Sequence, residues 1–207
     1  MRYLYFFLLL GFTFFAKAQS IVEKEMEVSH IQQFHFKVDE VFSVHISTHP
    51  NIENLKIKTF SEGEYAQNIG FHFTEENEVM TIKTVFPESL SSGYDKLSAH
   101  KVFSVRLEIE IPEHKRVVIQ SDLASVYGKG NYQFFEAELT SGRCELIQFT
   151  GEAIVNTFKG DIELQTKEKK VEAFSNHGEV NIGSYFIKGD KISLKSIDGD
   201  INVKHEE

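Results

Sequence analysis

The chain has 207 residues, with 22 Lys and Arg against 31 Asp and Glu, and a formal net charge of −9. This acidic balance argues against nucleic acid as a partner, because such binding depends on basic side chains that neutralise phosphates, and against electrostatic attraction to anionic lipid. It leaves cations, neutral glycans and proteins. The single cysteine, Cys144, excludes an internal disulfide, so packing must stabilise the fold.

The first 18 residues have the three parts of a secretory signal peptide. Arg2 supplies positive charge, Tyr3 to Phe15 is an apolar run, and Ala16-Lys17-Ala18 is an A-x-A cleavage signal. The 13-residue run is shorter than the roughly 20 residues that cross a bilayer, which argues against a membrane anchor. We therefore expect cleavage before Gln19 and export to the periplasm, the outer cell surface or the medium. Cleavage removes Arg2 and Lys17 and no acid, which takes the formal charge from −9 to −11.

Apolar and polar residues alternate from Phe34 to Pro112, which is typical of half-buried strands. No stretch has a convincing helical period. We therefore predict a β-rich region over residues 19–112, with a polar surface loop at 87–100. The apolar positions of its strands are Phe34, Phe36 and Val38; Phe42, Val44 and Ile46; Leu55 and Ile57; Ile69, Phe71 and Phe73; and Phe103, Val105, Leu107, Ile109 and Ile111.

A short phrase recurs five times in the remaining chain. It starts with a small or hydroxyl residue in most copies and has a small residue three positions later, and that later position advances by 18, 18, 18 and finally 21 residues. A fixed period near 20 residues is the sequence signature of a solenoid. The phrase starts at Ser121, Leu139, Thr157, Ser175 and Ser196, and the later position holds Ala124, Gly142, Gly160, Gly178 and Gly199.

Apolar columns flank the phrase on both sides, so each period predicts two short strands joined at a corner. Glycine at the corner would let successive coils approach closely. We therefore predict an all-β fold, in which residues 19–112 lead into a β-solenoid over 113–205 that resembles a parallel β-helix and continues the same domain. The inward columns are Val117, Phe135, Ala153, Val171 and Ile192; Ile119, Ala137, Val155, Ala173 and Leu194; Val126, Cys144, Ile162, Val180 and Ile201; and Leu146, Leu164, Ile182 and Val203.

The signal peptide, the strand that ends in Ile109-Glu110-Ile111-Pro112 and the coils that read Gly160-Asp161-Ile162, Gly178-Glu179-Val180 and Gly199-Asp200-Ile201 carry a family resemblance. Over residues 30–205 the sequence resembles the "putative adhesin" family of bacterial cell-envelope proteins, which includes auto-transporter-adhesin-like head domains of unknown function. The resemblance implies a β-solenoid outside the cytoplasm, with a role in surface adhesion or envelope maintenance. It implies no catalytic residues.

Two outward columns beside the corner are rich in acids. Neighbours in a column should lie about 4.8 Å apart, so the acids could form a cation site or the carboxylate pair of a polysaccharide enzyme. The alternative is a solvated charged face in which Arg143 pairs with Asp161, and we favour it because no basic residue recurs beside the acids. The columns are Ser125, Arg143, Asp161, Glu179 and Asp200; and Tyr127, Glu145, Glu163, Asn181 and Asn202.

The other reactive residue types form no catalytic or metal-binding motif. The nine histidines lack zinc-ligand spacing, Cys144 falls in an inward column, where we expect a small buried hydrophobe, and Asp198-Gly199-Asp200 is only a fragment of a calcium loop. Aromatic residues outside the columns could form a glycan or protein contact surface. These are Tyr127, Tyr132, Phe149, Phe158, Phe174 and Tyr185.

The sequence therefore favours an exported, non-enzymatic binding or structural module of the bacterial cell envelope. It predicts no catalytic, cofactor-binding or metal-binding residue and no cofactor. A protein or glycan is the expected partner. Two alternatives remain open: a carbohydrate-active enzyme built on a parallel β-helix, and a periplasmic partner of an envelope-stress system.

Overall fold

The structure is a computed structural model that describes residues 19–62, 70–86 and 104–206. This part of the chain is all-β, as predicted, and contains no helix. The predicted signal peptide, the predicted loop at 87–100 and the predicted strand positions Ile69 and Phe103 lie outside the described residues. The strands are β1 (Gln19–Glu27), β2 (Gln33–Lys37), β3 (Ser43–His49), β4 (Asn54–Glu62), β5 (Gly70–Glu76), β6 (Val79–Val85), β7 (Ser104–Pro112), β8 (Arg116–Ser121), β9 (Ser125–Ser141), β10 (Cys144–Lys159), β11 (Ile162–Thr166), β12 (Lys170–Ser175), β13 (Val180–Ile182), β14 (Ile187–Ser196) and β15 (Ile201–His205).

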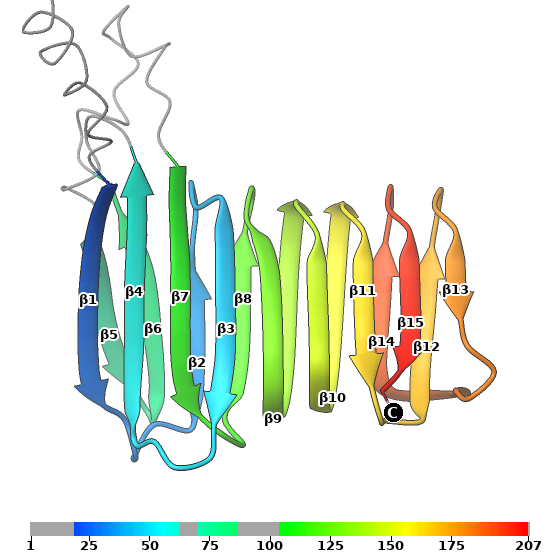
Figure 1. Ribbon diagram of the computed structural model, residues 1–207, viewed down its shortest axis with the longest axis horizontal. Helices are drawn as coiled ribbons and strands as arrows, with labels where there is room; N and C mark the ends of the chain where they lie inside the picture. Colours follow the sequence, from blue (N-terminus) through cyan, green and yellow to red (C-terminus); the bar gives the residue numbers. More distant parts are fainter. Residues whose placement is uncertain (1–18, 63–69, 87–103, 207) are drawn as a thin grey trace, which may run out of the picture.

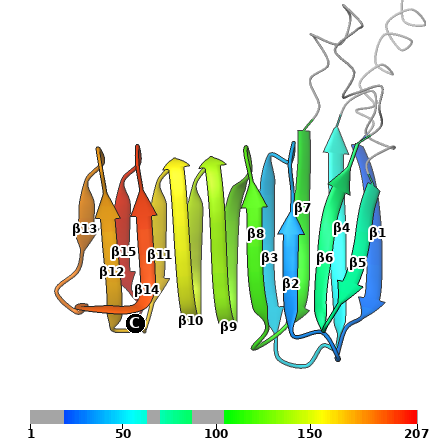
Figure 2. The ribbon, with the colours of Figure 1, turned by 180° about the vertical axis from the view of Figure 1, so that it is seen from behind.

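The strands form one mixed sheet that extends over two layers (Figures 1 and 2). Layer one has the order β1-β4-β7-β3-β9-β10-β11-β15-β13, and layer two has the order β5-β6-β2-β8-β9-β10-β14-β12. The long strands β9 and β10 belong to both layers. The first part of β9 pairs with β3 and its last part pairs with β8, so the chain changes layer within the strand.

Between the layers lies one apolar core, made by alternate residues of almost every strand. The large side chains that are fully buried include Phe34, Phe36, Phe135 and Phe149. Alternation along a strand puts successive side chains on opposite faces, so the other residues of each strand face outward. Burial of this apolar surface is the main stabilising contribution to the fold.

The repeat period appears directly in the strand register. Cys144 pairs with Val126 on one side and with Ile162 on the other, each time in parallel and 18 residues apart. The predicted columns are therefore confirmed as ladders, and their members are buried or half-buried except Val180 and Ile182 in the terminal strand β13, which are exposed. Each repeat contributes one strand segment to layer one and one to layer two.

The corner phrase is the point at which the backbones of neighbouring repeats touch. A Cβ atom on Gly160 would lie under 3.0 Å from the carbonyl oxygen of Gly142, and one on Gly199 would clash with Gly160 in the same way. Only glycine allows this approach. The first repeat can hold Ala124 at this position because no other corner phrase precedes it in the stack. Its neighbour on that side is the turn before β3, where the Phe42 carbonyl accepts the Ser125 N–H at 3.0 Å.

Side chains of the phrase also bond across the corner. Ser175 Oγ accepts the Gly178 N–H at 3.0 Å and donates to the Gly199 carbonyl at 2.7 Å. Outside the corner, Asp161 Oδ1 accepts the Asp200 N–H at 3.0 Å, and Asp200 Oδ1 accepts the Glu179 N–H at 2.8 Å. The hydroxyls and acids of the phrase thus bind backbone groups of adjacent repeats.

The last two repeats do not stack in chain order. Ile162 pairs with Ile201, and Ile201 pairs with Val180, so β14 and β15 lie between the third repeat and the terminal strands β12 and β13. The five corner positions do share one column, but its order is Ala124, Gly142, Gly160, Gly199 and Gly178.

Apolar burial explains this order. The inserted repeat carries Ile192, Leu194, Ile201 and Val203, which are 0–4% exposed. The matching positions of the terminal repeat hold Val171, Ala173, Val180 and Ile182, which are smaller in sum. A repeat with neighbours on both sides loses more surface to water than one at the end. The inserted position therefore suits the repeat with the larger apolar side chains.

Strands from the N-terminal region extend both layers. β2 pairs in parallel with β8, and β3 pairs in parallel with β9. β6 and β7 continue the two layers in parallel, and β4, β1 and β5 complete them with antiparallel pairs. The strands β1 and β6 were not predicted. Phe42, which was predicted as an apolar position of a half-buried strand, is 70% exposed; Val41 is buried instead, and the strand starts only at Ser43.

We predict that Gly160→Ala lowers the free energy of unfolding by at least about 2 kcal/mol, because the added methyl group overlaps the Gly142 carbonyl and the stack must shift. Chemical denaturation followed by circular dichroism measures the change. Gly70→Ala is the matched control, since a Cβ atom there meets nothing within 4 Å. Equal stability of the two variants would contradict the corner geometry.

A second prediction separates charge from hydrogen bonding at the corner. Asp161→Ala should cost about 1 kcal/mol, because the Asp200 N–H loses its acceptor. Asp161→Asn keeps an acceptor oxygen and should change stability by less than about 0.5 kcal/mol. Ile162→Asp should cause the largest loss of stability of the three variants, since it places a carboxylate at a fully buried position. Asparagine as damaging as alanine would show that the negative charge itself is needed.

Candidate functional site

The two predicted outward columns lie on the outer face of layer one. Their register follows the strand pairs, with Tyr127 beside Glu145, Glu145 beside Glu163, and Glu163 beside Asn202. The predicted ion pair between Arg143 and Asp161 is not among the ion pairs of the described residues; Asp161 binds backbone instead. The described residues also contain no group of three or more His, Cys, Asp or Glu that could hold a metal ion.

His45 and Tyr127 form an aromatic pair on the same face. Their rings stack with centroids 4.5 Å apart and planes 10° apart. Partial burial, and next the positive charge of Arg106, lower the pKa of His45. The ring is therefore biased toward its neutral form, which makes it a surface for contact rather than a source of positive charge.

Several residues singled out in the sequence are structural. Cys144 is fully buried, and burial raises the pKa of its thiol to about 12, which makes it a poor nucleophile. Tyr132 and Phe149, which were predicted as candidates for a glycan or protein contact surface, are instead buried, at 3% and 0% exposure. Their rings stack at 5.6 Å where β9 and β10 change layer, and Tyr132 donates to the Ile46 carbonyl at 3.0 Å.

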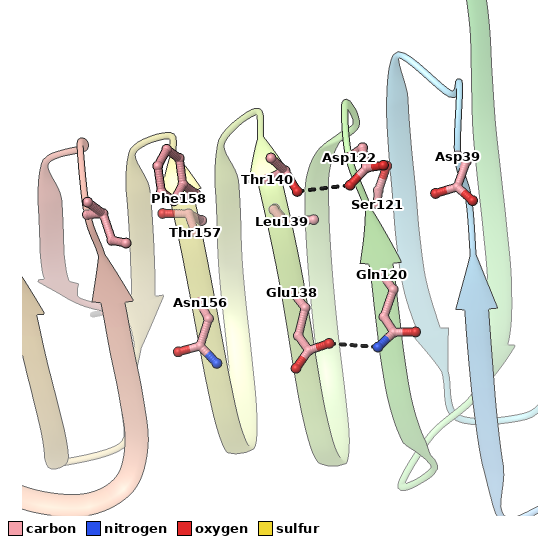
Figure 3. Close-up of a pocket in the computed structure, with 11 residues that line it drawn as sticks. Asp39, Gln120, Ser121, Asp122, Glu138, Leu139, Thr140, Asn156, Thr157 and Phe158 are labelled. Carbon is pink, nitrogen blue, oxygen red and sulfur yellow. Dashed lines mark hydrogen bonds between the residues drawn. The ribbon is translucent and has the colours of Figure 1, made fainter.

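The candidate site is an open pocket of about 440 Å³ on the outer face of layer two. We call it the layer-two pocket (Figure 3). Buried Ser121, Leu139 and Thr157, at the ends of three neighbouring strand segments, form its floor. Its more exposed lining residues are Asp39, Gln120, Asp122, Glu138, Thr140, Asn156, Phe158 and Ile197.

The polar side chains of the pocket stand in two rows that cross the strands. Gln120, Glu138 and Asn156 are register neighbours in one row, and Gln120 Nε2 donates to Glu138 Oε2 at 2.6 Å. In the other row, Thr140 Oγ1 donates to Asp122 Oδ1 at 2.9 Å (Figure 3). These bonds hold the carboxylates in place before any ligand arrives.

Asp39 closes one end of the pocket, although it lies 81 residues before Gln120 in the sequence. Its position follows from the pairing of β2 with β8: the Val38 N–H donates to the Gln120 carbonyl at 3.0 Å, and Ser121 Oγ donates to the Val38 carbonyl at 2.8 Å. Phe158 flanks the pocket at the corner and is 47% exposed. Sequence analysis named Phe158 as a contact residue and Ser121, Leu139 and Thr157 as starts of the repeated phrase. It did not predict the pocket, because most of the other lining residues occupy variable positions of the repeat and Asp39 lies outside the repeats.

The lining combines acidic, amide, hydroxyl and aromatic groups. None of its eleven residues is His, Lys, Arg or Cys, although Gln120 Oε1 also bonds to His35 Nε2 at 2.9 Å outside the lining. The carboxylates of Asp122 and Glu138 each accept a hydrogen bond from a neighbouring side chain. The described part of the chain also has no helix that is long and apolar enough to span a membrane.

No protein-family model and no curated protein matches the sequence. Among solved structures, a protein of Clostridium sporogenes named as a putative cell adhesion protein matches 91% of this chain and 100% of its own, with a TM-score of 0.64 and 16% identity. A putative adhesin of Bacteroides fragilis covers 90% of this chain and 97% of its own, at a TM-score of 0.36 and 9% identity. The first match shows that the chain shares its fold with a protein named for cell adhesion, in agreement with the adhesin-like resemblance of its sequence.

Proposed function

We propose that the protein is an exported, non-enzymatic binding module of the bacterial cell envelope, and that its parallel ladders build a β-solenoid that presents two outer faces to partners. The signal-peptide pattern of residues 1–18 supports export. The name of the Clostridium sporogenes neighbour, a putative cell adhesion protein, supports a surface role.

The observation that carries this proposal is the layer-two pocket. It is open and polar, it has its own hydrogen bonds, and most of its side chains stand on strands, while Asp39, Asp122 and Ile197 stand on the turns that follow strands. Rigid placement lowers the entropy that a binding surface loses when it engages a partner. A pocket of this kind suits recognition of a surface ligand.

The enzyme alternative is less well supported by the acid columns. Two catalytic carboxyl groups need different environments, so that one stays protonated while the other ionises. Asp161 and Asp200 instead have the same role, since each accepts a backbone N–H of the next repeat. Carboxylate oxygens that accept backbone hydrogen bonds stabilise the stack, and these two are held in that role.

We predict that the purified protein has no hydrolase or lyase turnover on polysaccharides, with or without calcium, and that it fractionates with the periplasm, the cell surface or the medium. Reducing-end assays and cell fractionation measure the two outcomes. A calcium-dependent activity that is lost in a folded Glu163→Ala variant would favour the enzyme. Recovery of the protein, with residues 1–18 intact, only from the cytoplasm would contradict export.

A further inference from the structure

We propose that the layer-two pocket binds an uncharged saccharide, whose chain lies across the strands along the two polar rows. This proposal rests on the binding function proposed above and assigns its ligand class. It depends on the charge, the hydrogen-bonding groups and the apolar surface of the pocket.

The charge of the lining selects against anionic ligands. Asp39, Asp122 and Glu138 surround the pocket, and none of its eleven lining residues is basic. The nearest cations in the strand register, Lys37 beside Gln120 and Lys195 beside Asn156, lie at the two ends of the row and outside the lining. An anionic sugar over the middle of the pocket would therefore meet the carboxylates of Asp122 and Glu138 at short range. A neutral hydroxyl group can instead donate to a carboxylate, in a charge-assisted hydrogen bond.

The amide of Asn156 is the group most available to such a ligand. Gln120 and Glu138 bond to each other, whereas the Asn156 side chain makes no hydrogen bond with any described residue, although it is half-buried and lines the pocket. An amide presents both donors and an acceptor. Sugar hydroxyl groups also donate and accept, so one ring edge can use both ends of the amide.

Phe158 supplies the apolar half of the site. Its ring is 47% exposed and lies at the corner next to the polar rows (Figure 3). An exposed aromatic ring beside fixed polar groups is typical of a contact surface. The C–H groups on one face of a sugar ring can pack on the negative face of this ring while the hydroxyl groups reach Asn156 and Glu138.

The direction of the ligand follows from the register. Gln120, Glu138 and Asn156 come from neighbouring strand segments of one layer, so they repeat at about 4.8 Å, the spacing between strands. An extended sugar chain placed across the strands would meet a new polar side chain at each step. A chain parallel to the strands would leave the rows after one contact.

The test is a panel of neutral gluco-, galacto-, manno- and N-acetylglucosamine oligosaccharides, with sialylated and sulfated oligosaccharides as the anionic arm, measured by calorimetry on the purified protein. We expect saturable binding of at least one neutral oligosaccharide, weakened about tenfold or more by Asn156→Ala and by Phe158→Ala. Matched controls are Asn202→Ala on layer one and Phe42→Ala, an exposed aromatic residue just before β3 of layer one and outside the pocket. Both controls should bind as the unchanged protein does.

Three results would overturn the assignment: no binding of any neutral oligosaccharide, binding of the anionic arm only, or binding that Asn156→Ala and Phe158→Ala leave unchanged. Circular dichroism and thermal unfolding show whether each variant is folded. Glu138→Gln is a further pocket variant that keeps the side-chain volume. Cross-linking in cells separates this proposal from the binding function. Capture of a protein partner by a chain that binds no sugar would overturn the saccharide and leave the binding module standing.

Discussion

The close approach of backbones at the corner is the constraint on which the rest of the structure depends. Gly160 and Gly199 stack so tightly on their neighbours that no side chain fits between them. This contact fixes the register between repeats, and the register decides which side chains enter the core and which face water, because a shift by one residue exchanges the two faces. The hydroxyl of Ser175 and the acid of Asp161 add hydrogen bonds at the same place. A four-residue phrase therefore specifies both the stacking of the chain and the orientation of its columns.

Stacking alone does not set the order of repeats, since every copy of the phrase offers the same contacts. The order is consistent with apolar burial, since the repeat with the larger apolar side chains lies inside the stack. The two ends of the stack differ in how they meet water. At one end, β1 is the edge strand of layer one and carries several charged side chains. Glu23 pairs with Lys56 at 2.8 Å, and the Lys24 ammonium group lies 4.0 Å from the centre of the Phe73 ring. Charged edge strands of this kind discourage pairing with other chains. At the other end, β13 contributes only Val180–Ile182, and its apolar side chains are partly exposed.

Much of the fold could be predicted from the sequence, because the columns follow from alternation and from the 18-residue period. The exchange of the last two repeats could not, because Ile201 fits beside either Ile162 or Val180 in the same register. The burial of Tyr132 and Phe149 was also missed. The register shifts between Ile147 and Phe149, so alternation counted from Cys144 gives the wrong face for Phe149. Tyr132 keeps the alternation of Val126 and Gly128, but it follows a polar run, 129–131, in which no residue is buried. Of the candidate site, only Phe158 was recognisable, since Asp39 joins it through the pairing of distant strands.

Repetition also limits where function can arise. Along layer one, Asp161 and Asp200 repeat one structural role, since each accepts a backbone N–H of the next repeat in the stack. Specificity must come from positions at which the repeats differ. On layer two, the rows change from Gln120 to Glu138 to Asn156 and from Asp122 to Thr140 to Phe158, which gives a different chemical group at each step. A regular frame thus supplies rigidity, while its variable outward positions supply a sequence of contacts that an extended ligand can follow.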